Sequence, residues 1–171
     1  SIFSQNKLVG YNASGKKEYE LSVEMSDPII DTNNRFLLIA EKGKQKIYLI
    51  SGNSIVWQKD LDGNISRINV NKNGYVSVIL TGTTYKSIIQ TFDNQGNEIF
   101  TTYLSSSIAM DSDISADNKY LSFAEISTDG TIVQSRIKTI SIQEAKEKEK
   151  KSETIINNVT SQSDSTILNL K

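Results

Sequence analysis

Residues 47–61 read Ile-Tyr-Leu-Ile-Ser-Gly-Asn-Ser-Ile-Val-Trp-Gln-Lys-Asp-Leu. An apolar run meets a short Ser-Gly-Asn turn and then a second run with β-branched and aromatic residues, which is the pattern of a β-hairpin. Trp57 precedes Leu61 by four positions, and residues four apart on a strand point to the same face. The stretch therefore predicts a hairpin that directs Trp57 and Leu61 into one core.

The same hairpin occurs elsewhere in the chain. It recurs at residues 8–23 and 88–104, each time around a turn that contains glycine. The equivalent pairs of a large and an aliphatic residue are Tyr19/Val23 and Phe100/Leu104, and Ile155/Val159 is a degenerate copy. Repetition of a supersecondary unit along the chain indicates a repeat architecture.

A second repeated element follows each hairpin and consists of a polar turn and an apolar strand. Its copies are residues 30–39, 70–78 and 114–123, in which an aromatic residue follows the turn at Phe36, Tyr75 and Tyr120. A period of about 40 residues with four strands per unit is typical of a β-propeller. The alternative, a β-sandwich with Greek-key links, does not explain the repeated turn and aromatic residue.

We therefore expect an all-β chain, a β-propeller segment of three to four four-stranded blades within a larger ring. A single domain over residues 1–171 would hold blades at 6–23 (third and fourth strands only), 24–61, 62–104 and 105–158, with 159–171 opening another. The chain does not begin with Met, which suggests a piece of a longer polypeptide. A half ring leaves a blade face open, so self-association through that face is expected.

Composition excludes several kinds of chemistry. The chain has 19 basic and 20 acidic residues, a balance that argues against a nucleic-acid partner. It has no Cys and no His, which rules out a Cys nucleophile, a Cys/His zinc site and a Ser-His-Asp triad. No run of about 18 apolar residues is present, so no membrane span is expected within this chain.

The residues at 47–61 and 114–123 resemble known propeller repeats. The first stretch looks like the repeat of bacterial PQQ-like (quinoprotein dehydrogenase-like) propellers, and the second is similar to the turn between the first two strands in TolB-like and WD40-like propellers. The resemblance covers about residues 7–158, and the chain most resembles uncharacterised membrane-anchored propellers of Gram-positive bacteria. True quinoproteins repeat the Trp in many blades, whereas here only Trp57 keeps it. No residue therefore matches a quinone or calcium ligand, and no cofactor is predicted.

Three groups of side chains are candidates for a site. Asp111, Asp113 and Asp117 offer oxygen ligands for calcium, although turn capping is the favoured interpretation. Asp31, Asp111 and Asp113 are candidate carboxylates for a hydrolase, because different blades can bring them to a central channel. Aromatic residues on neighbouring repeats suggest either blade packing, which we favour for Trp57, or a ligand-binding face: Tyr11, Tyr19, Tyr48 and Trp57.

A mixed-charge run at residues 144–153 has Glu and Lys residues four positions apart, which favours a short helix. We interpret it as a solvated connection between strands, with a protruding arm as the alternative.

The leading functional hypothesis is a non-enzymatic binding module outside the cytoplasm of a bacterium, with no predicted catalytic or metal residue. Its partner would be a protein or a cell-envelope glycan. One alternative is a degenerate quinoprotein or a carboxylate-based hydrolase. Another is a structural segment of a larger sensor or envelope protein.

Overall fold

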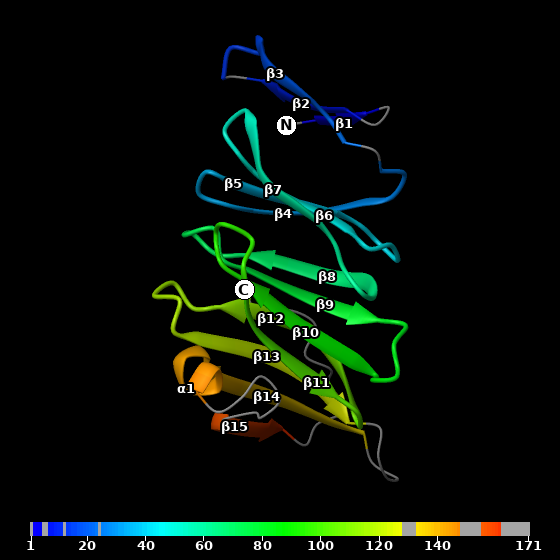
Figure 1. Ribbon diagram of the computed structural model, residues 1–171, viewed down its shortest axis with the longest axis vertical. Coiled ribbons are helices and arrows are strands. Elements are labelled where there is room, and N and C mark those ends of the chain that lie inside the picture. The colour runs from blue at the N-terminus through cyan, green and yellow to red at the C-terminus, as the bar shows by residue number, and fades with distance from the viewer. Residues whose placement is uncertain are drawn as a thin grey trace.

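The computed structural model describes residues 2–4, 7–11, 13–23, 25–127, 133–147 and 155–161. Within them the strands form four antiparallel sheets, stacked one after another along the long axis (Figure 1). The strands of the first two sheets are β1 (Ile2–Ser4), β2 (Lys7–Tyr11) and β3 (Lys17–Ser22), then β4 (Pro28–Asn33), β5 (Phe36–Glu41), β6 (Lys46–Ser51) and β7 (Ser54–Asp60). The third sheet holds β8 (Asn64–Val70), β9 (Val76–Thr81), β10 (Ser87–Phe92) and β11 (Glu98–Leu104). The fourth holds β12 (Ser107–Ile114), β13 (Tyr120–Ser127), β14 (Gln134–Ser141) and β15 (Ile155–Ser161), with helix α1 (Ile142–Glu147) after β14.

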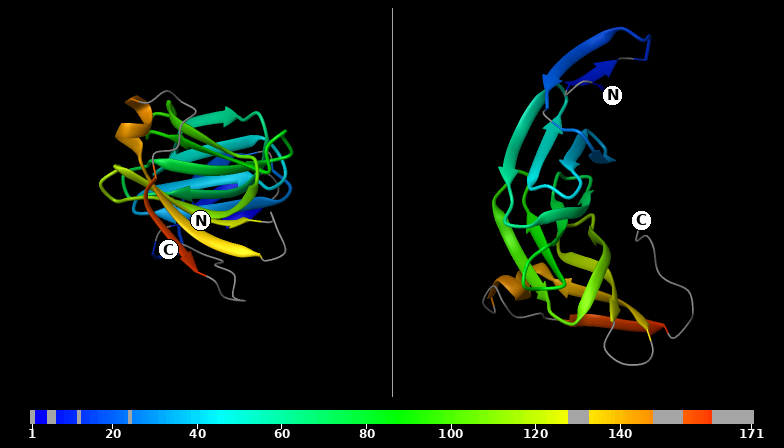
Figure 2. Two further views of the ribbon diagram at one scale, coloured as in Figure 1. Left: turned by 90° about the horizontal axis from the view of Figure 1, so that it is seen from below. Right: turned by 90° about the vertical axis from the view of Figure 1, so that its right-hand side faces the viewer.

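The sheets fan along an open arc (Figure 2). Strand β8 contacts β4 on one side and β12 on the other, so the first strands of successive four-stranded sheets are neighbours. They lie on the inner side of the arc, and β7 and β11 lie on its outer side. The prediction of an all-β propeller segment is thereby confirmed, with each four-stranded sheet as one blade.

The turns between the first and second strands of the second, third and fourth sheets differ in length but share one residue with a left-handed backbone. Asn34, Gly74 and Asn118 have φ angles of 53°, 82° and 62° at equivalent positions. Asn and Gly tolerate this left-handed conformation better than other residues do. The polar turns that repeat in the sequence therefore share this left-handed residue, two positions before the next strand.

The core consists of layers between adjacent sheets. In β5, Phe36, Leu38 and Ala40 face the third sheet, while Ile39 and Leu37 face the first. Burial on both faces explains why this strand is a continuous apolar run and does not alternate with polar residues. The equivalent layer between the third and fourth sheets includes residues from both: Ile79, Ile89, Phe100, Leu121, Phe123 and Ile140.

Two glycines of the third sheet receive aromatic rings of the second. A Cβ at Gly74 would lie 2.7 Å from the Phe36 ring, and a Cβ at Gly96 would lie 2.9 Å from the Trp57 ring. Trp57 is 8 % exposed, and its ring centroid lies 5.9 Å from that of Phe92. Trp57 thus packs between blades, as favoured from the sequence, and does not belong to an open ligand face.

A polar residue three positions before the left-handed residue of each turn links or braces neighbouring blades. The carboxylate of Asp31 accepts a hydrogen bond from the Val70 N–H at 2.8 Å. Asn71, at the equivalent position of the next blade, donates through Nδ2 to the Ser115 carbonyl at 3.1 Å. Ser115 occupies this position in the fourth sheet, where its hydroxyl accepts from the Tyr120 N–H at 3.0 Å. The repeated polar position therefore fastens adjacent inner strands and closes the turns.

The layer between the third and fourth sheets includes a buried ion pair. Lys138 Nζ lies 3.2 Å from Glu125 Oε1, and Glu125 is 1 % exposed. The Ser107 hydroxyl donates to the second oxygen of the same carboxylate at 2.6 Å. A buried carboxylate needs such partners because it has lost its hydration.

The C-terminal part differs from the expected blade limits. Val159 pairs with Ile137 and Ser161 with Ser135, so residues 159–161 continue the outer strand of the fourth sheet and do not open another blade. The cross-strand register requires this placement, and residues 162–171 lie outside the described part. Of the charged run, residues 144–147 lie in α1 and 148–153 lie outside the described residues. No helix among the described residues is long and apolar enough to cross a membrane.

Gly74→Ala is expected to destabilise the chain by about 3 kcal/mol, because it combines backbone strain with a clash on the Phe36 ring. Gly43→Ala is the matched control, since its φ is 72° but nothing lies near its Cβ position. It should cost only about 1 kcal/mol. Urea denaturation of both variants measures the difference, and equal losses would contradict the packing described here.

Lys138→Met should cost about 3 kcal/mol of unfolding free energy, because it leaves the Glu125 carboxylate buried without its cation. Glu125→Gln in the same chain keeps an acceptor for Ser107 and removes the charge. The double variant should therefore recover more than half of the loss in a urea titration. A double variant as unstable as Lys138→Met would show that the ion pair is not what Lys138 contributes.

Candidate functional site

One side of the arc carries the first and third turns of the blades. The turns after β2, β4, β6, β8, β10 and β12 lie there, along the left of Figure 1, together with α1. We call this side the turn face. Loops on a rigid sheet scaffold are common places for binding residues.

A hollow of about 280 Å³ opens on the turn face between the first and second sheets. We call it the tyrosine groove. Its lining comes from the turns of both sheets and from the strand ends beside them: Gly10, Tyr11, Tyr19, Thr32, Asn34, Arg35, Phe36, Leu37, Ile50 and Gly52.

The shape of the tyrosine groove follows from a close contact within the first sheet. A Cβ at Gly10 would lie 2.0 Å from the Tyr19 ring, so the absence of a side chain lets this ring lie against the strand. Tyr11 is 46 % exposed at the groove. The Arg35 guanidinium lies 5.1 Å from the centroid of the Phe36 ring, and this cation–π contact helps to hold the guanidinium at the groove.

The lining of the tyrosine groove combines the aromatic rings of Tyr11, Tyr19 and Phe36 with a guanidinium, an amide and a threonine hydroxyl. Aromatic faces pack against apolar ring surfaces, and the polar groups supply directional hydrogen bonds. Such a set suits a sugar, which has apolar ring faces and hydroxyl edges. Of the four aromatic residues singled out in the sequence, Tyr11 and Tyr19 come together here, whereas Tyr48 and Trp57 are buried in blade packing.

A second hollow, of about 400 Å³, lies at the equivalent junction of the third and fourth sheets. We call it the lysine groove. Lys119 and Lys146 line it with Tyr75, and Gln143 of α1 adds an amide. Burial tends to raise the pKa of Asp93 at its rim, but hydrogen bonds from Asn97 and backbone N–H groups outweigh this and lower it. Asp93 therefore carries its charge as a turn cap.

The basic residues of the two grooves were not selected as candidates from the sequence. Arg35 and Lys119 both stand directly before the repeated aromatic residue of the turn, at Phe36 and Tyr120. This shared position is the signal that identifies them, because a repeated turn places both at the same kind of junction.

The calcium candidates do not form one cluster. Asp111 and Asp113 lie on β12, whereas Asp117 lies in the following turn. Hydrogen bonds from the Ser115 hydroxyl and then the Lys119 N–H lower the pKa of Asp117. Asp117 thus caps the turn, and among the described residues no group of three or more acidic side chains has a geometry that fits a metal ion.

The carboxylates considered for a hydrolase also lie apart. Asp31 belongs to β4 and is buried against Val70, while Asp111 and Asp113 belong to β12. Strand β8 lies between β4 and β12. The structure therefore does not bring Asp31 to one substrate position together with Asp111 or Asp113.

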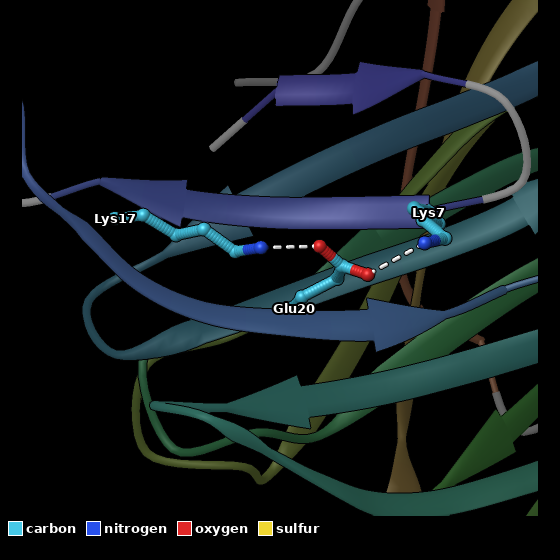
Figure 3. Close-up of polar contacts among 3 residues, drawn as sticks. All are labelled: Lys7, Lys17 and Glu20. Atoms are coloured by element: carbon cyan, nitrogen blue, oxygen red, sulfur yellow. Dashed lines mark hydrogen bonds and ion pairs between the residues drawn. The ribbon is translucent and has the colours of Figure 1, made fainter.

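Charged residues occupy the outward face of the first sheet. Lys7 Nζ lies 2.7 Å from Glu20 Oε1, and Lys17 donates to the other carboxylate oxygen (Figure 3). The hydrogen bond from Lys17, followed by that from Lys7, lowers the pKa of Glu20 to about 2. We call these three residues the lysine–glutamate triad.

A family model matches residues 2–171, and its description is "Family of unknown function (DUF5711)". No curated protein matches the chain.

Solved structures match through the fold. Hydrazine synthase of Kuenenia stuttgartiensis superposes with a TM-score of 0.62 at 14 % identity, over 92 % of this chain and 44 % of that one. Hsv2p of Kluyveromyces lactis superposes with a TM-score of 0.57 at 12 % identity, over 86 % of this chain and 47 % of that one. Both contain β-propellers, which supports the predicted fold, while the resemblance to PQQ-like repeats stays a prediction. The chain spans less than half the length of each of these two structures.

The triad predicts how stability changes in acid. The pKa of Glu20 is about 2 in the folded chain, against an ordinary value of 4.5. Its contribution is therefore present above about pH 4.5 and disappears as the pH falls towards 2. As the pH falls between these values, the melting temperature measured by circular dichroism should fall less in Glu20→Gln than in the parent chain. Identical acid profiles of the two chains would contradict the triad.

Proposed function

This chain belongs to the DUF5711 family, and we propose that it is a non-enzymatic binding module that holds a cell-envelope glycan through its turn face. The tyrosine groove is the proposed sugar site. The observation that carries the proposal is the meeting of Tyr11 and Tyr19 with Arg35 in one hollow of about 280 Å³.

The size and lining of the tyrosine groove support a saccharide unit within a polymer. The hollow is open along the turn face and is built from two sheets, so a glycan polymer can extend past it on both sides of the bound unit. Stacking on Tyr11 needs little rearrangement, because this ring is already exposed. Arg35 adds a positive charge, which favours a glycan that carries carboxylates.

The state of the acidic residues supports binding over catalysis. Asp31 accepts from the Val70 N–H, Asp93 from the Gln95 and Asn97 N–H groups, and Asp117 from the Lys119 N–H. Carboxylates that cap backbone groups in this way are suited to holding turns. A general acid or base would have to come from another position.

A location outside the cytoplasm is part of the proposal and rests on the resemblance to membrane-anchored propellers of Gram-positive bacteria. An external protease applied to intact cells tests it, because only an exported chain would be cleaved. Cleavage that requires lysis would refute this part of the proposal.

The binding part is tested with purified bacterial peptidoglycan and its soluble fragments. Tyr11→Ala should weaken retention on peptidoglycan by about fivefold, since the loss of one stacked ring is worth about 1 kcal/mol. Tyr85→Ala is the matched control: Tyr85 is 39 % exposed and lies outside the tyrosine groove, in the turn between β9 and β10.

Sedimentation with insoluble peptidoglycan and calorimetry with soluble fragments give the two measurements. Retention by the parent chain, its loss in Tyr11→Ala and its persistence in Tyr85→Ala would support the proposal. No retention by the parent chain, or equal loss in both variants, would refute a glycan site in the tyrosine groove.

A further inference from the structure

The two walls of the lysine groove carry opposite charges. The wall from the third sheet holds the carboxylates of Asp93 and Glu98, and the wall from the fourth sheet holds the ammonium groups of Lys119 and Lys146. Two cations and two carboxylates leave this lining with no net charge. The tyrosine groove differs, because Arg35 is the only charged residue among the described residues of its lining. The two grooves are therefore suited to ligands of different charge pattern.

The basic wall is fixed to the fourth sheet through its backbone. The Ile142 N–H donates to the Lys119 carbonyl at 2.8 Å, which joins the start of α1 to the turn before β13. Ile142 and Lys146 are four positions apart on α1, so they point to the same side of the helix. Helix α1 also contacts β11 of the third sheet. The two lysines are thus placed together at this junction, on the turn face (Figure 1).

The acidic wall comes from the turn between β10 and β11 and from the first residue of β11. Asp93 accepts from the Asn97 N–H at 2.9 Å and, through its other oxygen, from the Asn97 side-chain amide at 2.9 Å. Both of its oxygens therefore hold the turn. The Thr101 hydroxyl donates to one oxygen of Glu98 at 3.1 Å, which orients this carboxylate. Glu98 is exposed, so it is the carboxylate that a ligand can reach most directly.

The charged walls stand on either side of an apolar floor. Ile99 and Ile142 are buried side chains of the layer between the third and fourth sheets, and Tyr75 packs against the same layer. Among the described residues no ion pair joins the two walls. Opposite charges that stay apart can each bind a charged group of one ligand. The volume of about 400 Å³ is within the range of small-molecule sites, about 300–1,000 Å³.

We propose that the lysine groove binds a short peptide with free ends, a zwitterion with an apolar side chain. Its ammonium group lies at Glu98, and its carboxylate lies between Lys119 and Lys146. The apolar side chain contacts the floor at Tyr75 and Ile142. This inference goes beyond the glycan proposal and does not depend on it, because the lysine groove lies at a different junction and takes a ligand of different chemistry.

Leucyl-leucine and its two blocked forms test the charge pattern. The N-acetyl form has no ammonium group, and the C-terminal amide has no carboxylate. Each should bind about tenfold more weakly than leucyl-leucine, because one charge-assisted contact is lost. Titration calorimetry at millimolar peptide measures the affinities. Amide resonances followed by NMR should shift at residues of the lysine groove and not at those of the tyrosine groove.

Variants assign each charge to its wall. Lys119→Gln/Lys146→Gln should bind leucyl-leucine about tenfold more weakly and should no longer distinguish it from its amide. Glu98→Gln keeps an acceptor for the Thr101 hydroxyl and should no longer distinguish leucyl-leucine from its N-acetyl form. Lys72→Gln is the matched control, since Lys72 is exposed in the turn between β8 and β9 and lies outside the lining of the lysine groove. Circular dichroism verifies that each variant is folded.

Binding of leucyl-leucine by the parent chain, weaker binding of both blocked forms and loss of each distinction in the corresponding variant would support the proposal. No binding at millimolar peptide would overturn it, as would equal binding of the blocked forms. A loss in Lys72→Gln as large as in the double lysine variant would show a general attraction to the turn face and would overturn a site in the lysine groove. Resonance shifts confined to the tyrosine groove would overturn it as well.

Discussion

The packing of aromatic rings from one blade against the turns of the next is the constraint on which the structure depends. The Phe36 and Trp57 rings occupy the space where Gly74 and Gly96 have no side chain. Each sheet alone is too thin to bury its apolar residues, so its stability comes from the layers it shares with its neighbours. This coupling turns independent four-stranded sheets into one arc.

The layers between the sheets are filled by different side chains, and this difference determines at which junctions the two grooves open. Between the second and third sheets the rings fill the junction at the turn face. In the first sheet Tyr19 lies on Gly10, and the junction with the second sheet stays open as the tyrosine groove. Between the third and fourth sheets the layer includes the Glu125–Lys138 pair, and the lysine groove opens beside α1. The tyrosine and lysine grooves thus open at the two junctions that flank the ring-to-glycine packing of Phe36 and Trp57.

The repeat in the sequence was enough to predict the propeller segment, because hairpin, turn and aromatic residue recur in register with the blades. The packing of Trp57 followed from the same reasoning. The roles of Arg35 and Gly10 were not predictable, since they depend on how two sheets approach each other. Turn capping was the interpretation favoured from the sequence, and Asp117 does cap its turn. That Asp111 and Asp113 lie on β12, apart from Asp117, required the structure.

Amide hydrogen exchange across the chain tests most directly whether the shared layers hold the arc together. The slowest exchange should occur in β5, β6, β9 and β10, which lie in the middle of their sheets and are buried on both faces. Strands β2 and β3 should exchange faster, because one face of their sheet carries the charged triad. Protection that is equal in all four sheets, or greatest in the first, would contradict the account.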